Sequence, residues 1–134
     1  MIGHHQALIY TMVLVSASDG EMTDAELLTI GEIIKQFPIF EDFDMSTLAG
    51  TAEACAGVLA DEDGLDQAGE LISSSLPAKL HETAYALACD VAAADGSLSQ
   101  EELQLLRWLR GRLGINRLEA AAIERGARAH YMTL

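Results

Sequence analysis

The stretch Asp95-Gly96-Ser97-Leu98-Ser99-Gln100-Glu101-Glu102-Leu103 decides the fold, because an almost identical pattern stands 76 residues earlier. That earlier copy is Asp19-Gly20-Glu21-Met22-Thr23-Asp24-Ala25-Glu26-Leu27. Both copies follow the pattern Asp-Gly-x-apolar-Ser/Thr-x-x-Glu-Leu. The glycine is typical of the end of one helix, and Ser or Thr three residues before Glu predicts a capping box at the start of the next helix. The repetition predicts two helix–loop–helix halves, about residues 7–39 and 83–115, inside a single domain over residues 1–134.

Helical spacing of apolar residues continues on both sides of these motifs. It predicts seven helices, at about residues 5–18, 24–37, 45–59, 66–73, 78–94, 100–113 and 117–130. No stretch alternates apolar and polar residues long enough for a strand, and only 5% of residues are aromatic. We therefore expect an all-α, compact single-domain bundle, with the apolar helices 5–18 and 78–94 at its centre.

Charge is distributed unevenly along the chain, whose formal net charge is -13. Residues 1–106 hold 19 acids and two cations, whereas residues 107–134 hold six arginines and two glutamates. So acidic a protein repels phosphate backbones, which argues against nucleic acid as a partner. The basic C-terminal end has two interpretations: it docks a partner, or it balances acidic neighbours within the fold.

The cysteines and the apolar N-terminal run bear on the compartment. Cys55 and Cys89 lack the paired spacing of a disulfide framework or a zinc site, and we expect both to be small buried hydrophobes in a reducing cytoplasm. Residues 7–17 lack the cationic start of a signal peptide, and no run reaches the ~20 apolar residues of a membrane span. We expect a cytoplasmic protein without membrane insertion.

The paired motifs also place carboxylates where they could bind a hard divalent cation such as Ca²⁺ or Mg²⁺. The candidate metal ligands are Asp19, Glu26, Asp95 and Glu102, with Asp90, Glu21 and Glu101 as second-rank neighbours. A complete EF-hand is excluded, because Val15 and Ala17 would fall on its first acidic positions. The alternative is that these acids only cap helices.

Asp90 is unusual because no other charge lies between Glu82 and Asp95, and its counterpart in the first half is Leu14. A buried carboxylate is costly unless it is paired. We expect it to bond to a helix N-terminus or to an arginine such as Arg107, with metal ligation as the alternative.

Catalytic signatures are missing from the sequence. It holds no nucleophile elbow around Ser73–Ser75 and no glycine-rich phosphate loop. We therefore predict no catalytic or cofactor-binding residues, and a protein that is not an enzyme.

Residues 84–106 and 18–28, which carry the two Asp-Gly motifs, resemble the TerB-like (tellurite resistance) family, and the resemblance extends over about residues 7–115. It implies a duplicated all-helical domain, a role in bacterial stress and tellurite resistance, and metal binding by the acidic motif residues. Related domains are fused to co-chaperone-type and membrane-linked proteins. One departure is that Glu21 is matched by Ser97, so the two halves are not chemically equivalent.

Two functions follow from this resemblance and from the residues. The first is a non-enzymatic stress-response protein that binds a divalent cation. The second is an interaction module for other proteins, including a membrane-associated complex at the inner membrane, in which the acids are only caps.

Overall fold

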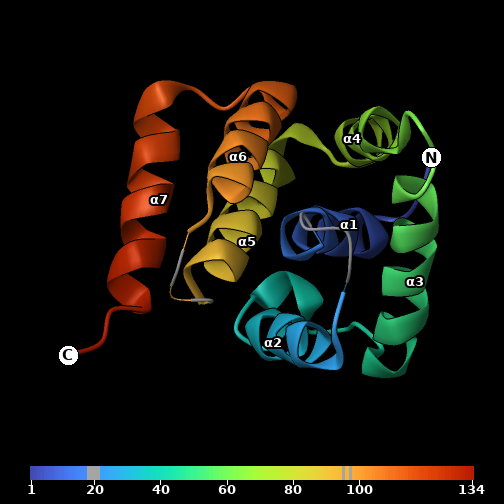
Figure 1. The fold of residues 1–134 in the computed structure, drawn as a ribbon, viewed down its shortest axis with the longest axis horizontal. Coiled ribbons are helices and arrows are strands. Elements are labelled where there is room, and N and C mark those ends of the chain that lie inside the picture. The colour runs from blue at the N-terminus through green and yellow to red at the C-terminus, as the bar shows by residue number, and fades with distance from the viewer. Residues whose placement is uncertain (18–21, 95, 97) are drawn as a thin grey trace.

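The computed structural model describes residues 1–17, 22–94, 96 and 98–134, and these form helices without any strand (Figure 1). The α-helices are α1 (His4–Ser16), α2 (Asp24–Ile34), α3 (Leu48–Leu59), α4 (Gly64–Ser75), α5 (His81–Ala94), α6 (Gln100–Leu113) and α7 (Arg117–His130). Three 3₁₀ turns join them: η1 (Pro38–Phe40), η2 (Met45–Thr47) and η3 (Ala78–Leu80). The predicted all-α bundle of seven helices is confirmed.

Two helices form the centre of the bundle. α5 packs against α1, α2, α6 and α7, while α1 packs against α3, α4 and α5. Figure 1 shows α7 at one edge of the molecule and α3 at the opposite edge, with the C-terminus beyond α7. On one side of the molecule α3 and α4 therefore cover α1, and on the opposite side α6 and α7 cover α5.

Burial confirms that the two apolar helices are central. Every residue from Ala7 to Val15 of α1 is buried, and so are Ala84, Tyr85 and most of α5 up to Ala92. Burying a large aliphatic side chain is worth about 1.5–3 kcal/mol, so α1 supplies a large share of the favourable folding energy.

Helix starts agree with the sequence, because they are set by local hydrogen bonds. The Thr23 and Ser99 side chains each accept from the backbone of the glutamate three residues on, and the Asn116 side chain does the same at α7. Gly114 ends α6 in the left-handed conformation, with φ 68. The duplication of the two halves stays a prediction.

Several other helix limits were wrong. The second helix ends at Ile34 rather than residue 37, because Phe37 is extended before Pro38, where η1 begins. The third helix starts at Leu48, since Asp44 caps η2 instead of the α-helix, and η3 takes the first turn predicted for the fifth helix.

The fourth helix is longer than predicted and starts at Gly64 instead of residue 66. A side chain at Gly64 would collide with the backbone of Val58 and Leu59, so a glycine permits this close turn between α3 and α4. The first helix ends at Ser16, and its predicted stop at Gly20 lies outside the described residues.

None of the helices in the described part of the chain has the length and apolar character needed to cross a bilayer.

Candidate functional site

The Asp-Gly motifs are only partly described by the structure. Asp19, Glu21 and Asp95 lie outside the described residues. Glu26 lies in the first turn of α2, and Glu101 and Glu102 lie in the first turn of α6. Among the described residues, no three His, Cys, Asp or Glu side chains converge as a metal site would require. Pooling of the four candidate ligands therefore stays a prediction.

Both described candidate ligands of the first rank have a structural role. Glu26 Oε1 accepts from the Thr23 backbone N–H at 2.8 Å, and the Glu26 N–H donates to Thr23 Oγ1 at 3.1 Å. Glu102 and Ser99 repeat this exchange at 3.1 Å in both directions. Each glutamate thus closes a capping box, in which its Oε1 accepts the backbone N–H of the residue that caps the start of the helix.

Asp90 is buried on α5, with 8% of its surface exposed. Burial raises the pKa of its carboxyl, and the nearby His130 on α7 partly offsets the rise. No described side chain hydrogen-bonds to Asp90 or forms an ion pair with it, so the expected pairing with an arginine such as Arg107 was wrong. Asp90 instead lies near the C-terminal end of α7, where burial and, after it, the Asp90 carboxylate raise the pKa of Tyr131.

The cysteines are buried, as the sequence predicts. Burial raises the pKa of the Cys55 thiol to about 12 and that of Cys89 to about 12. Both thiols therefore stay protonated near neutral pH, a state that disfavours nucleophilic or metal-binding roles.

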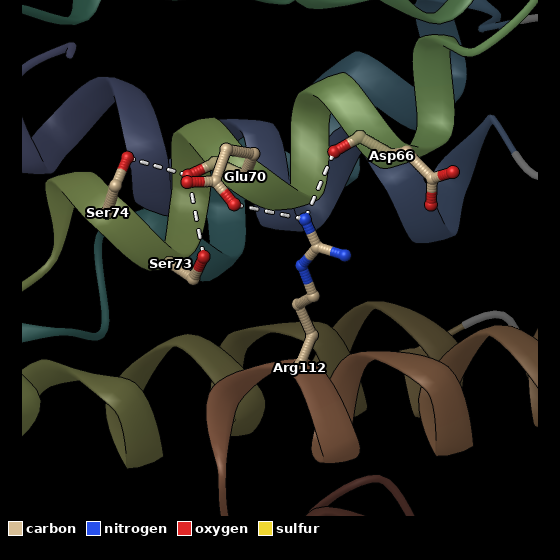
Figure 2. Close-up of polar contacts among 5 residues, drawn as sticks. All are labelled: Asp66, Glu70, Ser73, Ser74 and Arg112. Atoms are coloured by element: carbon tan, nitrogen blue, oxygen red, sulfur yellow. Dashed lines mark hydrogen bonds and ion pairs between the residues drawn. The ribbon is translucent and has the colours of Figure 1, made fainter.

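One arginine of the basic C-terminal end balances acidic neighbours within the fold. Arg112 Nη2 on α6 lies 3.3 Å from Glu70 Oε2 and donates to the Asp66 carbonyl at 3.3 Å, as Figure 2 shows. Its guanidinium also lies over the Trp108 ring, 5.8 Å from the centroid. Arg112 thus joins α6 to α4.

Four other arginines lie around a groove between α5, α6 and α7. The groove has a volume of about 1070 Å³. Arg107 and Arg110 belong to the α6 wall, and Arg125 and Arg128 to the α7 wall. None of the four lies within ion-pair distance of a described carboxylate, which distinguishes them from Arg112.

The lining of the groove is mostly apolar. Small side chains of α5 and α7 and leucines of α6 line it, among them Ala92, Ala93, Leu103, Leu106, Ala121 and Ala122. Three large hydrophobic side chains that line it are exposed to solvent: Leu98 at 47%, Leu118 at 79% and Met132 at 67%. Clustered exposed hydrophobic residues with polar residues around them are typical of a surface that contacts another molecule.

Among the described residues that line the groove, the one carboxylate is that of Glu124, and it accepts a hydrogen bond. The Tyr85 hydroxyl on α5 donates to Glu124 Oε2 on α7 at 2.6 Å. Burial and this bond raise the pKa of Tyr85. Glu124 is thus fixed by the Tyr85 hydroxyl, and the four arginines dominate the charge of the walls.

Sequence reasoning singled out the basic C-terminal end but missed the groove. The signal lay in two arginine pairs, Arg107 with Arg110 and Arg125 with Arg128, each spaced by three residues on a helix. Spacing places each pair on one helix face, but it does not show that the two faces lie across from one another.

Comparison with known proteins gives one family match. A family model described as tellurite resistance protein TerB matches residues 5–125 of the 134-residue chain. No curated protein and no solved structure matches the chain.

Proposed function

Because the chain belongs to the tellurite resistance protein TerB family, we propose that it acts in a tellurite-resistance-type system as a helical module that binds a partner protein. The contact site is the groove between α5, α6 and α7. In this proposal the protein is not an enzyme, works in the cytoplasm, and reaches the inner membrane only through its partners.

The observation that carries this proposal is the groove itself. It combines exposed apolar side chains such as Leu118 and Met132 with four arginines that no described carboxylate neutralises. A protein interface typically has an apolar core and a polar rim in which arginine is enriched. The cap glutamates Glu26 and Glu102, in contrast, already have partners in their own loops.

Site-specific photocrosslinking in bacterial cells tests the groove as the contact site. A photoreactive amino acid replaces Leu118 on the α7 wall in one strain and Leu65 on α4 in another. Leu65 is also an exposed leucine, but it is absent from the groove. We expect a discrete crosslinked product from position 118 and none from position 65. No product at position 118, or the same product at both, contradicts the proposal.

We propose a divalent cation at the Asp-Gly motifs as the second candidate function. Glu26 and Glu102 each use Oε1 for the cap, and no described residue hydrogen-bonds to either Oε2. Together with Asp19 and Asp95, these oxygens supply the hard ligands that Ca²⁺ and Mg²⁺ prefer.

Calorimetry of metal-stripped protein with Ca²⁺, Mg²⁺, Mn²⁺ and Zn²⁺ tests the cation directly. A cation that binds only the folded state raises stability by about 2.7 kcal/mol at a hundredfold excess over Kd. We expect a rise in Tm that the double variant Asp19→Asn, Asp95→Asn abolishes. NaCl at matched ionic strength is the control, because screening also stabilises a chain of charge -13. A rise that NaCl reproduces, or that the double variant keeps, leaves the acids as helix caps.

A further inference from the structure

We infer that the groove between α5, α6 and α7 binds one amphipathic helix of a partner protein, whose apolar stripe is flanked by Glu or Asp. This inference rests on the proposed function and adds the chemistry of the partner to it. The shape of the groove, its apolar lining and its charge each support one part of it.

The arrangement of the three helices leaves room for a fourth. α6 and α7 both pack on α5, but they make few direct contacts with one another in the described chain. The short connection between Leu113 and Arg117 makes them antiparallel neighbours. Each has 14 residues and is therefore about 21 Å long. A helix of three to four turns matches the length of these walls and would complete a four-helix bundle.

α7 has apolar residues on two faces, although only one face packs within the chain. Ala120 and Ala127 are buried on the face toward α5. Leu118, Ala121 and Ala122 line the groove at helical spacing. A helix with two apolar faces requires a neighbour on each. The alanines allow another helix to approach closely, while Leu118 would pack against its larger side chains.

The charge of the walls selects an acidic partner. Arg107 and Arg110 on one side, and Arg125 and Arg128 on the other, border the apolar lining. Arginine forms bidentate pairs with carboxylates, so Glu or Asp residues flanking the apolar stripe of a bound helix would pair with both walls. The favourable contacts are local to the groove walls, and they fix the orientation of the bound helix although the whole chain has a formal net charge of -13.

A second copy of this chain does not fit the groove in a symmetric dimer. A symmetric dimer formed groove to groove would bring the four arginines of each copy together. Like charges facing each other across an interface are strongly unfavourable. Among the described lining residues each copy has one carboxylate, Glu124, against four arginines, so this carboxylate offsets only part of the repulsion.

Fluorescence anisotropy with the full chain and a designed probe tests the inference. The probe is a labelled, hydrocarbon-stapled helix of about 16 residues, about 24 Å long, with leucines on one face and glutamates on both flanks. Stapling is needed because an isolated helix this short is marginal in water. Matched probes carry Lys in place of every Glu, or the same residues in scrambled order. We expect the acidic probe to bind at least tenfold more tightly than either control probe.

Charge reversal in the groove should reverse this preference. In the variant Arg107→Glu, Arg110→Glu, Arg125→Glu, Arg128→Glu we expect at least tenfold weaker binding of the acidic probe and tighter binding of the Lys probe. The milder quadruple Gln variant keeps the test valid if the Glu variant is not folded by circular dichroism. Arg117→Glu is the control, because Arg117 is exposed on α7 outside the groove, and it should change Kd less than twofold.

The outcomes separate this inference from the proposed function. Equal binding of the acidic and Lys probes, or acidic binding that survives both quadruple variants, overturns the acidic helix. Binding of the chain to phosphatidylglycerol vesicles without binding of the acidic probe also overturns it, in favour of an anionic membrane. A crosslink at position 118 in cells would still support the groove as a contact site in either case.

Discussion

α1 and α7 both pack along the central helix α5, yet their surroundings differ. α1 is also covered by α3 and α4, and nine of its 13 residues are buried. α7 packs mainly against α5, and only Ala120 and Ala127 of its 14 residues are buried. Contact with the central helix therefore does not decide how much of a helix is hidden. Burial depends on whether further helices cover the face turned away from α5, and in the described part of the chain no helix covers that face of α7.

The comparison also explains where the charge lies. α1 carries no Asp, Glu, Lys or Arg, because its neighbours leave no solvated face for them. α7 carries Arg117, Arg125 and Arg128 as well as two glutamates. Leu118 on α7 and Met132 just after it nevertheless remain exposed, which marks the side of α7 beside α6 as a surface for another molecule.

The largest effect is expected from truncating the same residue type on the two helices. Leu8→Ala removes a fully buried side chain of α1 and should lower the free energy of unfolding by about 2–5 kcal/mol. Leu118→Ala on α7 should change it by less than about 0.5 kcal/mol, since that side chain is 79% exposed. Urea unfolding of both variants measures the difference. Similar losses at the two positions would contradict the comparison.

Replacing two glycines by alanine should change the stability of the protein in opposite directions. A Cβ at Gly69 on α4 would lie 2.6 Å from the Trp108 ring of α6, so Gly69→Ala should destabilise the protein by about 1–3 kcal/mol. Gly126 on α7 has open space around it, and Gly126→Ala should stabilise by about 0.5–1 kcal/mol through helix propensity.

Thermal and urea unfolding of the two alanine variants measures both changes in stability. A loss at Gly126 similar to that at Gly69 would mean that α7 is packed on both faces, contrary to its exposure.

The helix caps should behave alike on both sides of the molecule. Thr23→Ala at α2 and Ser99→Ala at α6 each remove a hydroxyl that accepts a backbone N–H at 3.1 Å, and each should cost about 1 kcal/mol. The measurement is the denaturation midpoint, with Thr133→Ala in the exposed C-terminal segment as the control. Unchanged midpoints in both cap variants would exclude the capping role.

The smallest effect is a pH dependence at the contact between α5 and α7. Because burial raises the pKa of Asp90, the folded protein holds that proton to higher pH than the unfolded chain does. The free energy of unfolding should therefore fall as pH rises above about 4, the usual carboxyl range. Asp90→Asn removes this decline, so its stability relative to the wild type should increase between pH 3 and pH 7.

Urea unfolding at several pH values measures this trend. Asp90→Leu, which introduces the residue found at the matching position 14, should remove it too. A constant difference between Asp90→Asn and the wild type across the range would show that Asp90 titrates alike in both states.

The sequence predicted the parts of this fold that depend on neighbouring residues. Thr23 and Ser99 were identified as helix starts because one side-chain oxygen and one backbone N–H three residues away are enough to define a cap. The start of α4 at Gly64 was missed, because it depends on the close approach of Val58 and Leu59.

The groove was missed for the same reason, because it depends on how helices distant in the sequence lie next to one another. Helical periodicity separates faces of a helix, but it does not say which of two apolar faces packs within the chain. On α7 the sequence alone does not distinguish the face of the buried Ala120 from the face of Leu118 and Ala122, which line the groove. Only the positions of α5 and α6 make that distinction. Asp90 was noticed for its isolation, whereas its neighbour His130 comes from a helix 40 residues away.

Because α5 buries α1, α1 remains without this cover during synthesis until α5 has been made. α1 ends at Ser16 and α5 begins at His81, so 64 residues must be made between them. At about 5–20 residues per second, a ribosome needs about 3–13 s for that distance. α3 and α4, which reach α1 earlier, are its first available cover in that interval. Until they arrive, the nascent chain carries an unprotected apolar helix, and a chaperone that delays aggregation has its clearest target there.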